Sequence, residues 1–175
     1  YILAGFFHVL GGFSFKAVAL YSAVMGAIGT VSVYLLLRLY LGGGASLFFA
    51  AVAALTLYMP RAHPWLDETA ILFYLVSLTA FSIAYMYRDK MSSGKITCLS
   101  VLSGLALTAS IFQKHNIGLT AFVCTVPLWF FVSIGTEEKL INRVRGFGIC
   151  LLSTLLSLSC LVLYFESNGS FFADI

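Results

Sequence analysis

Long apolar segments alternate with short polar interruptions along the whole chain. Six of these segments lie at residues 17–40, 45–59, 69–87, 96–112, 117–135 and 146–165. Inside lipid, every backbone N–H and C=O must be paired within the protein, which favours continuous helices. Because an α-helix needs roughly 20 residues to cross a bilayer, the pattern predicts an all-α polytopic transmembrane helix bundle of about six spans.

The polar interruptions contain residues that end helices. Gly42-Gly43-Gly44 follows the first segment, Pro60 ends the second, and Ser92-Ser93-Gly94 precedes the fourth. Pro127 lies inside the fifth segment and predicts a kink there. A transmembrane barrel would instead show segments of about 10 residues with alternating polarity. Continuous apolar runs exclude that architecture.

Residues 1–15 are apolar and aromatic but too short to cross a bilayer. The chain thus begins in the middle of the pattern, and we expect it to be a fragment of a longer polypeptide. We treat residues 1–175 as one transmembrane helical region.

Small residues recur at helical spacing in two segments. Ser22, Gly26 and Thr30 are four residues apart in the first, and Ser100, Gly104 and Thr108 repeat the spacing in the fourth. Such stripes let helices approach one another closely in lipid. They predict packing faces and carry no information about chemistry.

Composition agrees with a membrane protein. Hydrophobic residues make up 61% of the chain and charged residues 10%, whereas soluble domains have about 45–50% and 25% respectively. These values exclude a soluble enzyme domain, a disordered chain and a disulfide-stapled module. The basic residues are scattered and form no stripe, so we expect no nucleic-acid partner. The four cysteines have no metal-ligand spacing.

The distribution of basic residues predicts the orientation. With six spans, one side receives Arg38, Arg88, Lys90, Lys95, Lys139, Arg143 and Arg145, and the other receives Lys16, Arg61 and Lys114. Cytoplasmic loops carry the excess of Lys and Arg. The 88–95 and 136–145 loops are therefore predicted to be cytoplasmic, and the 60–68 and 113–116 loops non-cytoplasmic.

The first polar cluster precedes the third segment and contains His63, Asp67 and Glu68. Acidic residues at a helix N-terminus interact favourably with the helix dipole, which explains them without any function. Alternatively, Asp67 binds a polar substrate group, a metal or a basic partner at the membrane surface. The residue spacing alone favours the structural explanation.

The second cluster, Gln113-Lys114-His115-Asn116, separates the fourth and fifth segments. This connection is too short for a relaxed loop, so Lys114 is held near the membrane boundary. A lysine there can extend to lipid headgroups, or it can meet the phosphate of a lipid-linked substrate. Gln113 and Asn116 supply amide groups for phosphate or sugar hydroxyls, and His115 can transfer a proton.

The order of these features resembles the GT-C superfamily of membrane glycosyltransferases, and most closely the protein mannosyltransferases and the bacterial aminoarabinose transferases. The resemblance covers most of residues 1–130, and the ordered pair of Asp67 and Lys114 carries most weight. The matching segments are Tyr1 to Gly12, Tyr21 to Gly42, HPWLDE at 63–68, and SGLALTASIFQK at 103–114.

The resemblance implies sugar transfer from a polyprenyl-phosphate carrier to a glycan, lipid or protein acceptor at the non-cytoplasmic face. An acidic residue of the first outward loop would be the general base. That loop would precede Tyr1, so we expect residues 1–175 to be inactive alone. Lys114 would neutralise the carrier phosphate, and Asp67 would orient the acceptor, the donor or a metal. Glu68, His63, His115 and Asn116 are further candidate binding residues.

Two other functions stay open. A transporter or channel segment would place charges at mid-membrane, whereas the charges here cluster at the segment ends. A structural membrane subunit without chemistry would keep Asp67 and Lys114 far apart. The cofactor is unknown, with a divalent metal as one possibility, and membrane lipid is an expected partner in every case.

Overall fold

The computed structural model describes residues 8–9, 12, 14–57, 66–134 and 140–167. This part of the chain is helical and contains no strand. Its elements are α2 (Phe15–Arg38), α3 (Gly43–Leu57), α4 (Leu66–Met86), the short 3-10 helix η1 (Arg88–Lys90), α5 (Ser93–Gln113), α6 (His115–Ile134) and α7 (Leu140–Ser167). The all-α prediction is confirmed for these residues.

Four helical segments of the described chain are long and apolar enough to cross a membrane: Phe15–Arg38, Thr69–Met86, Ser93–Gln113 and Arg145–Tyr164. Gly43–Leu55 is a shorter apolar helix, and α6 remains helical through Pro127. Large apolar side chains stay on the outer surface, including Phe48 and Leu163, each 63% exposed. Such a surface is unfavourable in water and natural in lipid. The helices indicate an integral membrane protein.

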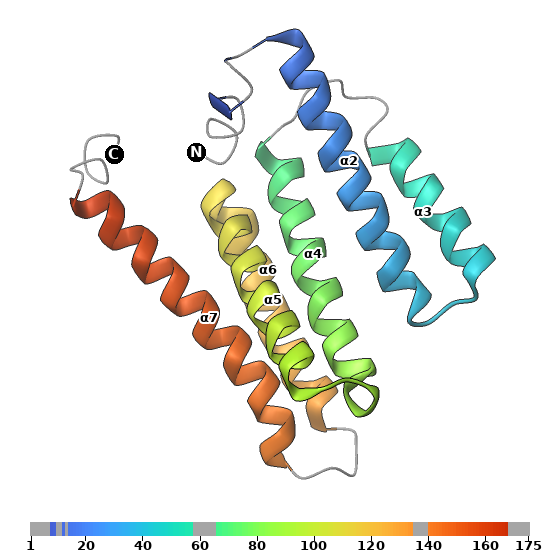
Figure 1. Cartoon of the computed structure of the whole chain (residues 1–175), viewed down its shortest axis with the longest axis vertical. Coiled ribbons are helices and arrows are strands. Elements are labelled where there is room, and N and C mark those ends of the chain that lie inside the picture. Colours follow the sequence, from blue (N-terminus) through green and yellow to red (C-terminus); the bar gives the residue numbers. More distant parts are fainter. Residues whose placement is uncertain (1–7, 10–11, 13, 58–65, 135–139, 168–175) are drawn as a thin grey trace.

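Successive helices run in opposite directions, as Figure 1 shows. α4 and α5 form the central pair. α7 and α6 pack against α5, α2 packs against α4, and α3 lies beyond α2. The bundle therefore has two ends, and the connections between helices alternate between them.

Small hydroxyl side chains hold the central helices together. Ser103 Oγ on α5 donates to the carbonyl oxygen of Ser77 on α4 at 2.9 Å. Cys150 Sγ on α7 donates a hydrogen bond to Ser103 Oγ at 3.4 Å. Thr79 Oγ1 of α4 donates to the carbonyl oxygen of Ser32 on α2 at 3.2 Å. In lipid, such interhelical hydrogen bonds contribute about 0.6 kcal/mol each.

The predicted stripe on α5 is a packing face. A Cβ atom placed on Gly104 would lie 2.6 Å from the carbonyl oxygen of Cys150 and 2.8 Å from Ser153 Oγ, so only glycine allows this approach of α7. On α2, however, the buried residues are Ala17, Tyr21, Gly29 and Ser32. The predicted stripe of Ser22, Gly26 and Thr30 lies beside them and is half-buried. The Tyr21 hydroxyl meets Thr69 Oγ1 of α4 at 3.0 Å.

The two ends of the bundle differ in charge. Arg38, Arg88, Lys90, Lys95 and Arg145 lie at the end formed by the α2–α3 turn, η1 and the early part of α7, called here the basic end. Lys16 and Lys114 lie at the opposite end, called here the Lys114 end, with the start of α4. The described helices thus segregate these basic residues as the alternating pattern predicts.

Candidate functional site

A single extended residue joins α5 to α6. Lys114 has φ −152° and ψ 103°, which interrupts the helix between Gln113 and His115. Its backbone N–H donates to the carbonyl oxygen of Ser110 at 3.1 Å, and its own carbonyl oxygen accepts from Gly118 N–H at 2.9 Å. The backbone of Lys114 is therefore fixed from both helices at the end of the bundle, as the shortness of the polar cluster predicts.

This sharp reversal requires glycine at position 118. A Cβ atom there would overlap the backbone of Ile111 and lie 2.7 Å from the carbonyl carbon of Ser110. The obstacles are backbone atoms, which cannot rotate away as side chains do. Gly118 therefore permits the contact between α5 and α6 that sets the position of Lys114.

The start of α4 lies beside the end of α5. Ser110 Oγ donates to the carbonyl oxygen of Ala70 across this pair at 2.7 Å. Asp67 is three residues before Ala70, and Lys114 is four residues after Ser110, so each is about one helical turn from this contact. The backbone thus brings Asp67 and Lys114 to the same end of one helix pair.

Some of the predicted site lies outside the described residues. His63 falls in the undescribed 58–65 segment, and the side chains of Asp67 and Glu68 in the first turn of α4 are likewise not described. The binding roles of these three side chains remain predictions.

The described candidates differ in exposure. Lys114 is partly buried, whereas His115 and Asn116 are exposed at the start of α6. Asn116 Oδ1 accepts from the Ile117 N–H at 3.0 Å, so this amide oxygen is already used locally. Asn116 also lines a shallow hollow of about 440 Å³ with Tyr74, Ile117, Thr120 and Ala121.

Gln113 is the least expected feature of this end. Its side chain is 9% exposed, and its Nε2 atom has no hydrogen-bond partner among the described residues. A buried amide without a partner costs about 1–3 kcal/mol. Such groups are rare in native proteins and require a physical explanation. The sequence identified Gln113 as an amide donor, but its burial depends on the packing of α5 within the bundle.

No group of three or more His, Cys, Asp or Glu side chains that could hold a metal ion occurs among the residues that the structure describes. The side chain of Asp67, for which a role in orienting a metal was predicted, lies outside the described part of the chain. Geometry within the described chain therefore adds nothing in favour of a metal at the Lys114 end.

A better enclosed pocket lies at the basic end, where the sequence analysis identified no candidate site. Residues of η1, α5 and α7 contribute to it, among them Arg88, Ser100 and Arg145. These residues are far apart in the sequence, and their proximity follows from the packing of α7 against α5.

Comparisons with protein-family models, curated proteins and solved structures find no match for this chain. The resemblance to GT-C glycosyltransferases therefore rests on the quoted sequence segments alone.

Proposed function

We propose that this chain is part of a GT-C-like membrane glycosyltransferase with six spans, which transfers a sugar from a polyprenyl-phosphate carrier to an acceptor. In this proposal the Lys114 end faces the non-cytoplasmic side and the basic end faces the cytoplasm. The positive-inside rule supports this orientation, because the basic residues of the described helices gather at one end.

The observation that carries the proposal is the buried amide of Gln113 next to Lys114. Gln113 Nε2 has no hydrogen-bond partner among the described residues, and the adjacent ammonium group belongs to a residue with a fixed backbone. Phosphate oxygens accept hydrogen bonds from both donor types, and lysine adds a positive charge. A lipid-linked phosphate would pair the amide and place its apolar chain in the surrounding bilayer.

The transfer step defines the role of these donors. The acceptor hydroxyl attacks the anomeric carbon, the bond between that carbon and the carrier phosphate oxygen breaks, and a general base takes the hydroxyl proton. The carrier leaves as polyprenyl phosphate with one additional negative charge. Lys114 and Gln113 stabilise this developing charge, and positioned donors of this kind commonly contribute a factor of about 10²–10³ in rate.

The remaining candidates would surround the sugar and acceptor. Asp67 and Glu68, on the first turn of α4, would orient the acceptor, the donor or a metal. His63, His115 and Asn116 would bind hydroxyl groups at the membrane surface. We assign the general base to a residue preceding Tyr1, so the proposal applies to the full-length polypeptide.

Binding of the carrier tests the proposal directly. The full-length protein in nanodiscs is titrated with a synthetic polyprenyl phosphate, and Lys114→Ala and Gln113→Leu are compared with wild type. We expect each substitution to weaken binding at least tenfold, because each removes a donor to the phosphate. Lys95→Ala is the control, since it removes an exposed lysine at the basic end. Equal binding by Lys114→Ala and wild type would refute the phosphate role.

A further inference from the structure

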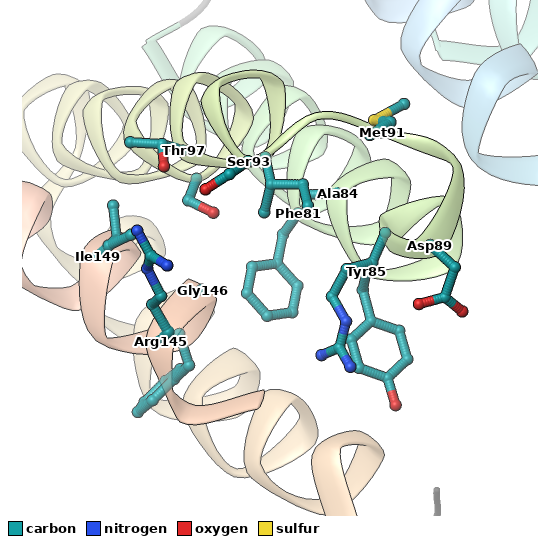
Figure 2. Close-up of a pocket in the computed structure, with 14 residues that line it drawn as sticks. Phe81, Ala84, Tyr85, Asp89, Met91, Ser93, Thr97, Arg145, Gly146 and Ile149 are labelled. Atoms are coloured by element: carbon teal, nitrogen blue, oxygen red, sulfur yellow. The ribbon is translucent and has the colours of Figure 1, made fainter. Parts of the chain in front are cut away.

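The pocket at the basic end has a volume of about 270 Å³ and lies between the end of α4, η1 and the first turns of α5 and α7. Figure 2 shows Phe81 near its middle, with Arg145 of α7 on one side and Asp89 on the other. It is at the opposite end of the bundle from Lys114. Its residues are separate from those of the proposed transfer site, and only the assignment of the leaflet rests on the orientation given under the proposed function.

Two arginines make the pocket cationic. Arg88 comes from η1 and Arg145 from α7, and both line the cavity. Arg145 is exposed, and no hydrogen bond or ion pair to its guanidinium is found within the described residues. Asp89 is the acidic residue of the pocket lining, and it is exposed on the side away from Arg145. A guanidinium in this position can bind a phosphate through two parallel hydrogen bonds.

The start of α5 opens into the same pocket. Ser93, Ile96 and Thr97 of its first turns line the cavity. The preceding residue, Ser92, makes no side-chain capping hydrogen bond. The first N–H groups of a helix have no partner within the helix, and the dipole makes this end partly positive. An anion in the pocket would therefore gain backbone donors as well as arginine.

A buried hydroxyl provides an independent sign of a missing ligand. Ser100 lines the pocket and is 1% exposed, and its Oγ atom has no hydrogen-bond partner among the described residues. Gly146 on α7 faces it without a side chain, since a Cβ atom there would lie 3.7 Å from Ser100 Oγ. Ser100 is seven residues after Ser93, or about 10 Å deeper along α5.

The inner walls of the pocket are apolar. Phe81, Ala84, Ile96, Phe147 and Ile149 contribute to them. A free inorganic phosphate would gain nothing from these side chains. From its mouth inward, the pocket presents arginines, then hydroxyl groups, then apolar side chains. A molecule that carries a phosphate, then ester oxygens, then hydrocarbon would match this order.

We propose that this pocket binds the headgroup of an anionic glycerophospholipid from the leaflet at the basic end. The phosphate lies at Arg145 and the start of α5, an ester carbonyl accepts from the Ser100 hydroxyl, and the acyl chains leave along the apolar wall. Basic pockets between transmembrane helices bind anionic lipid headgroups in this way, and the cytoplasmic leaflet is the one rich in such lipids.

The test measures phosphatidylglycerol binding to the full-length protein by native mass spectrometry from detergent. Wild type is compared with Arg145→Gln and with Lys95→Gln. The second variant is a matched control, since it removes one positive charge from an exposed side chain at the same end but outside the pocket lining. We expect Arg145→Gln to weaken binding about tenfold to a hundredfold, and Lys95→Gln to change it less than twofold.

Two further binding measurements distinguish a lipid phosphate from free inorganic phosphate. Phosphatidylcholine should bind more weakly than phosphatidylglycerol to wild type, and millimolar inorganic phosphate should not displace the lipid. At the same lipid concentration, bound phosphatidylglycerol should also raise the melting temperature of wild type and Lys95→Gln more than that of Arg145→Gln. Equal lipid binding by wild type and Arg145→Gln would overturn the proposal, as would complete displacement by inorganic phosphate.

Discussion

Gly118→Ala is the sharpest test of the described geometry. The added methyl group would overlap the backbone of Ile111 and approach the carbonyl carbon of Ser110 to 2.7 Å. Overpacking of this kind costs about 1–3 kcal/mol. Alanine regains about 1 kcal/mol from its higher helix propensity, and since the obstacles are backbone atoms we expect the steric cost to prevail. The net expectation is a destabilisation of up to about 2 kcal/mol.

The measurement is the free energy of unfolding in mixed micelles, with Gly148→Ala as the matched control. Gly148 lies inside α7, and a Cβ atom on it meets nothing within 4 Å. That substitution should therefore stabilise the protein by up to about 1 kcal/mol. If Gly118→Ala were as stable as Gly148→Ala, the close contact between α5 and α6 described above would be wrong.

Three other substitutions probe separate parts of the bundle. Gly104→Ala should destabilise the protein by up to about 2 kcal/mol net in the same unfolding assay, because its methyl group would meet an α7 carbonyl oxygen at 2.6 Å; a variant as stable as Gly148→Ala would contradict that helix contact. Tyr21→Phe removes the 3.0 Å hydrogen bond to Thr69 and should cost about 0.6 kcal/mol, up to roughly 1.7 kcal/mol; a stabilised variant would be inconsistent with it. In a cysteine-free background, a membrane-impermeant maleimide added from outside should label Asn116→Cys but not Asp89→Cys, and the opposite result would reverse the proposed orientation.

The helices were predictable because each has an uninterrupted apolar run. The predicted 96–112 segment differs from α5 mainly at its start. The helix begins at Ser93. Its first turn contains serine, glycine and lysine, which are tolerated at the start of a helix, although a search for apolar residues alone would exclude them. The 17–40 segment likewise corresponds to α2, which begins at Phe15 after Ser14 Oγ accepts a capping hydrogen bond.

The functional ends were predictable only in part. A short connection at residues 113–116 was expected, but the structure reduces it to Lys114 alone, because α5 continues to Gln113 and α6 begins at His115. The burial of Gln113 was not expected, because it depends on how the neighbouring helices pack against α5. The pocket around Arg145 and Ser100 was also missed, since side-chain proximity across α5 and α7 depends on packing and on the absence of a side chain at Gly146.

The hydrogen bonds that join Ser77, Ser103 and Cys150 also limit how α4, α5 and α7 can move relative to one another. If one helix slid along its neighbour by a single residue, about 1.5 Å, all of these hydrogen bonds would be strained together. Tilting about them leaves their lengths almost unchanged and widens one end of the bundle while narrowing the other. Relative motion of α4, α5 and α7 is therefore expected to be a tilt about this cluster.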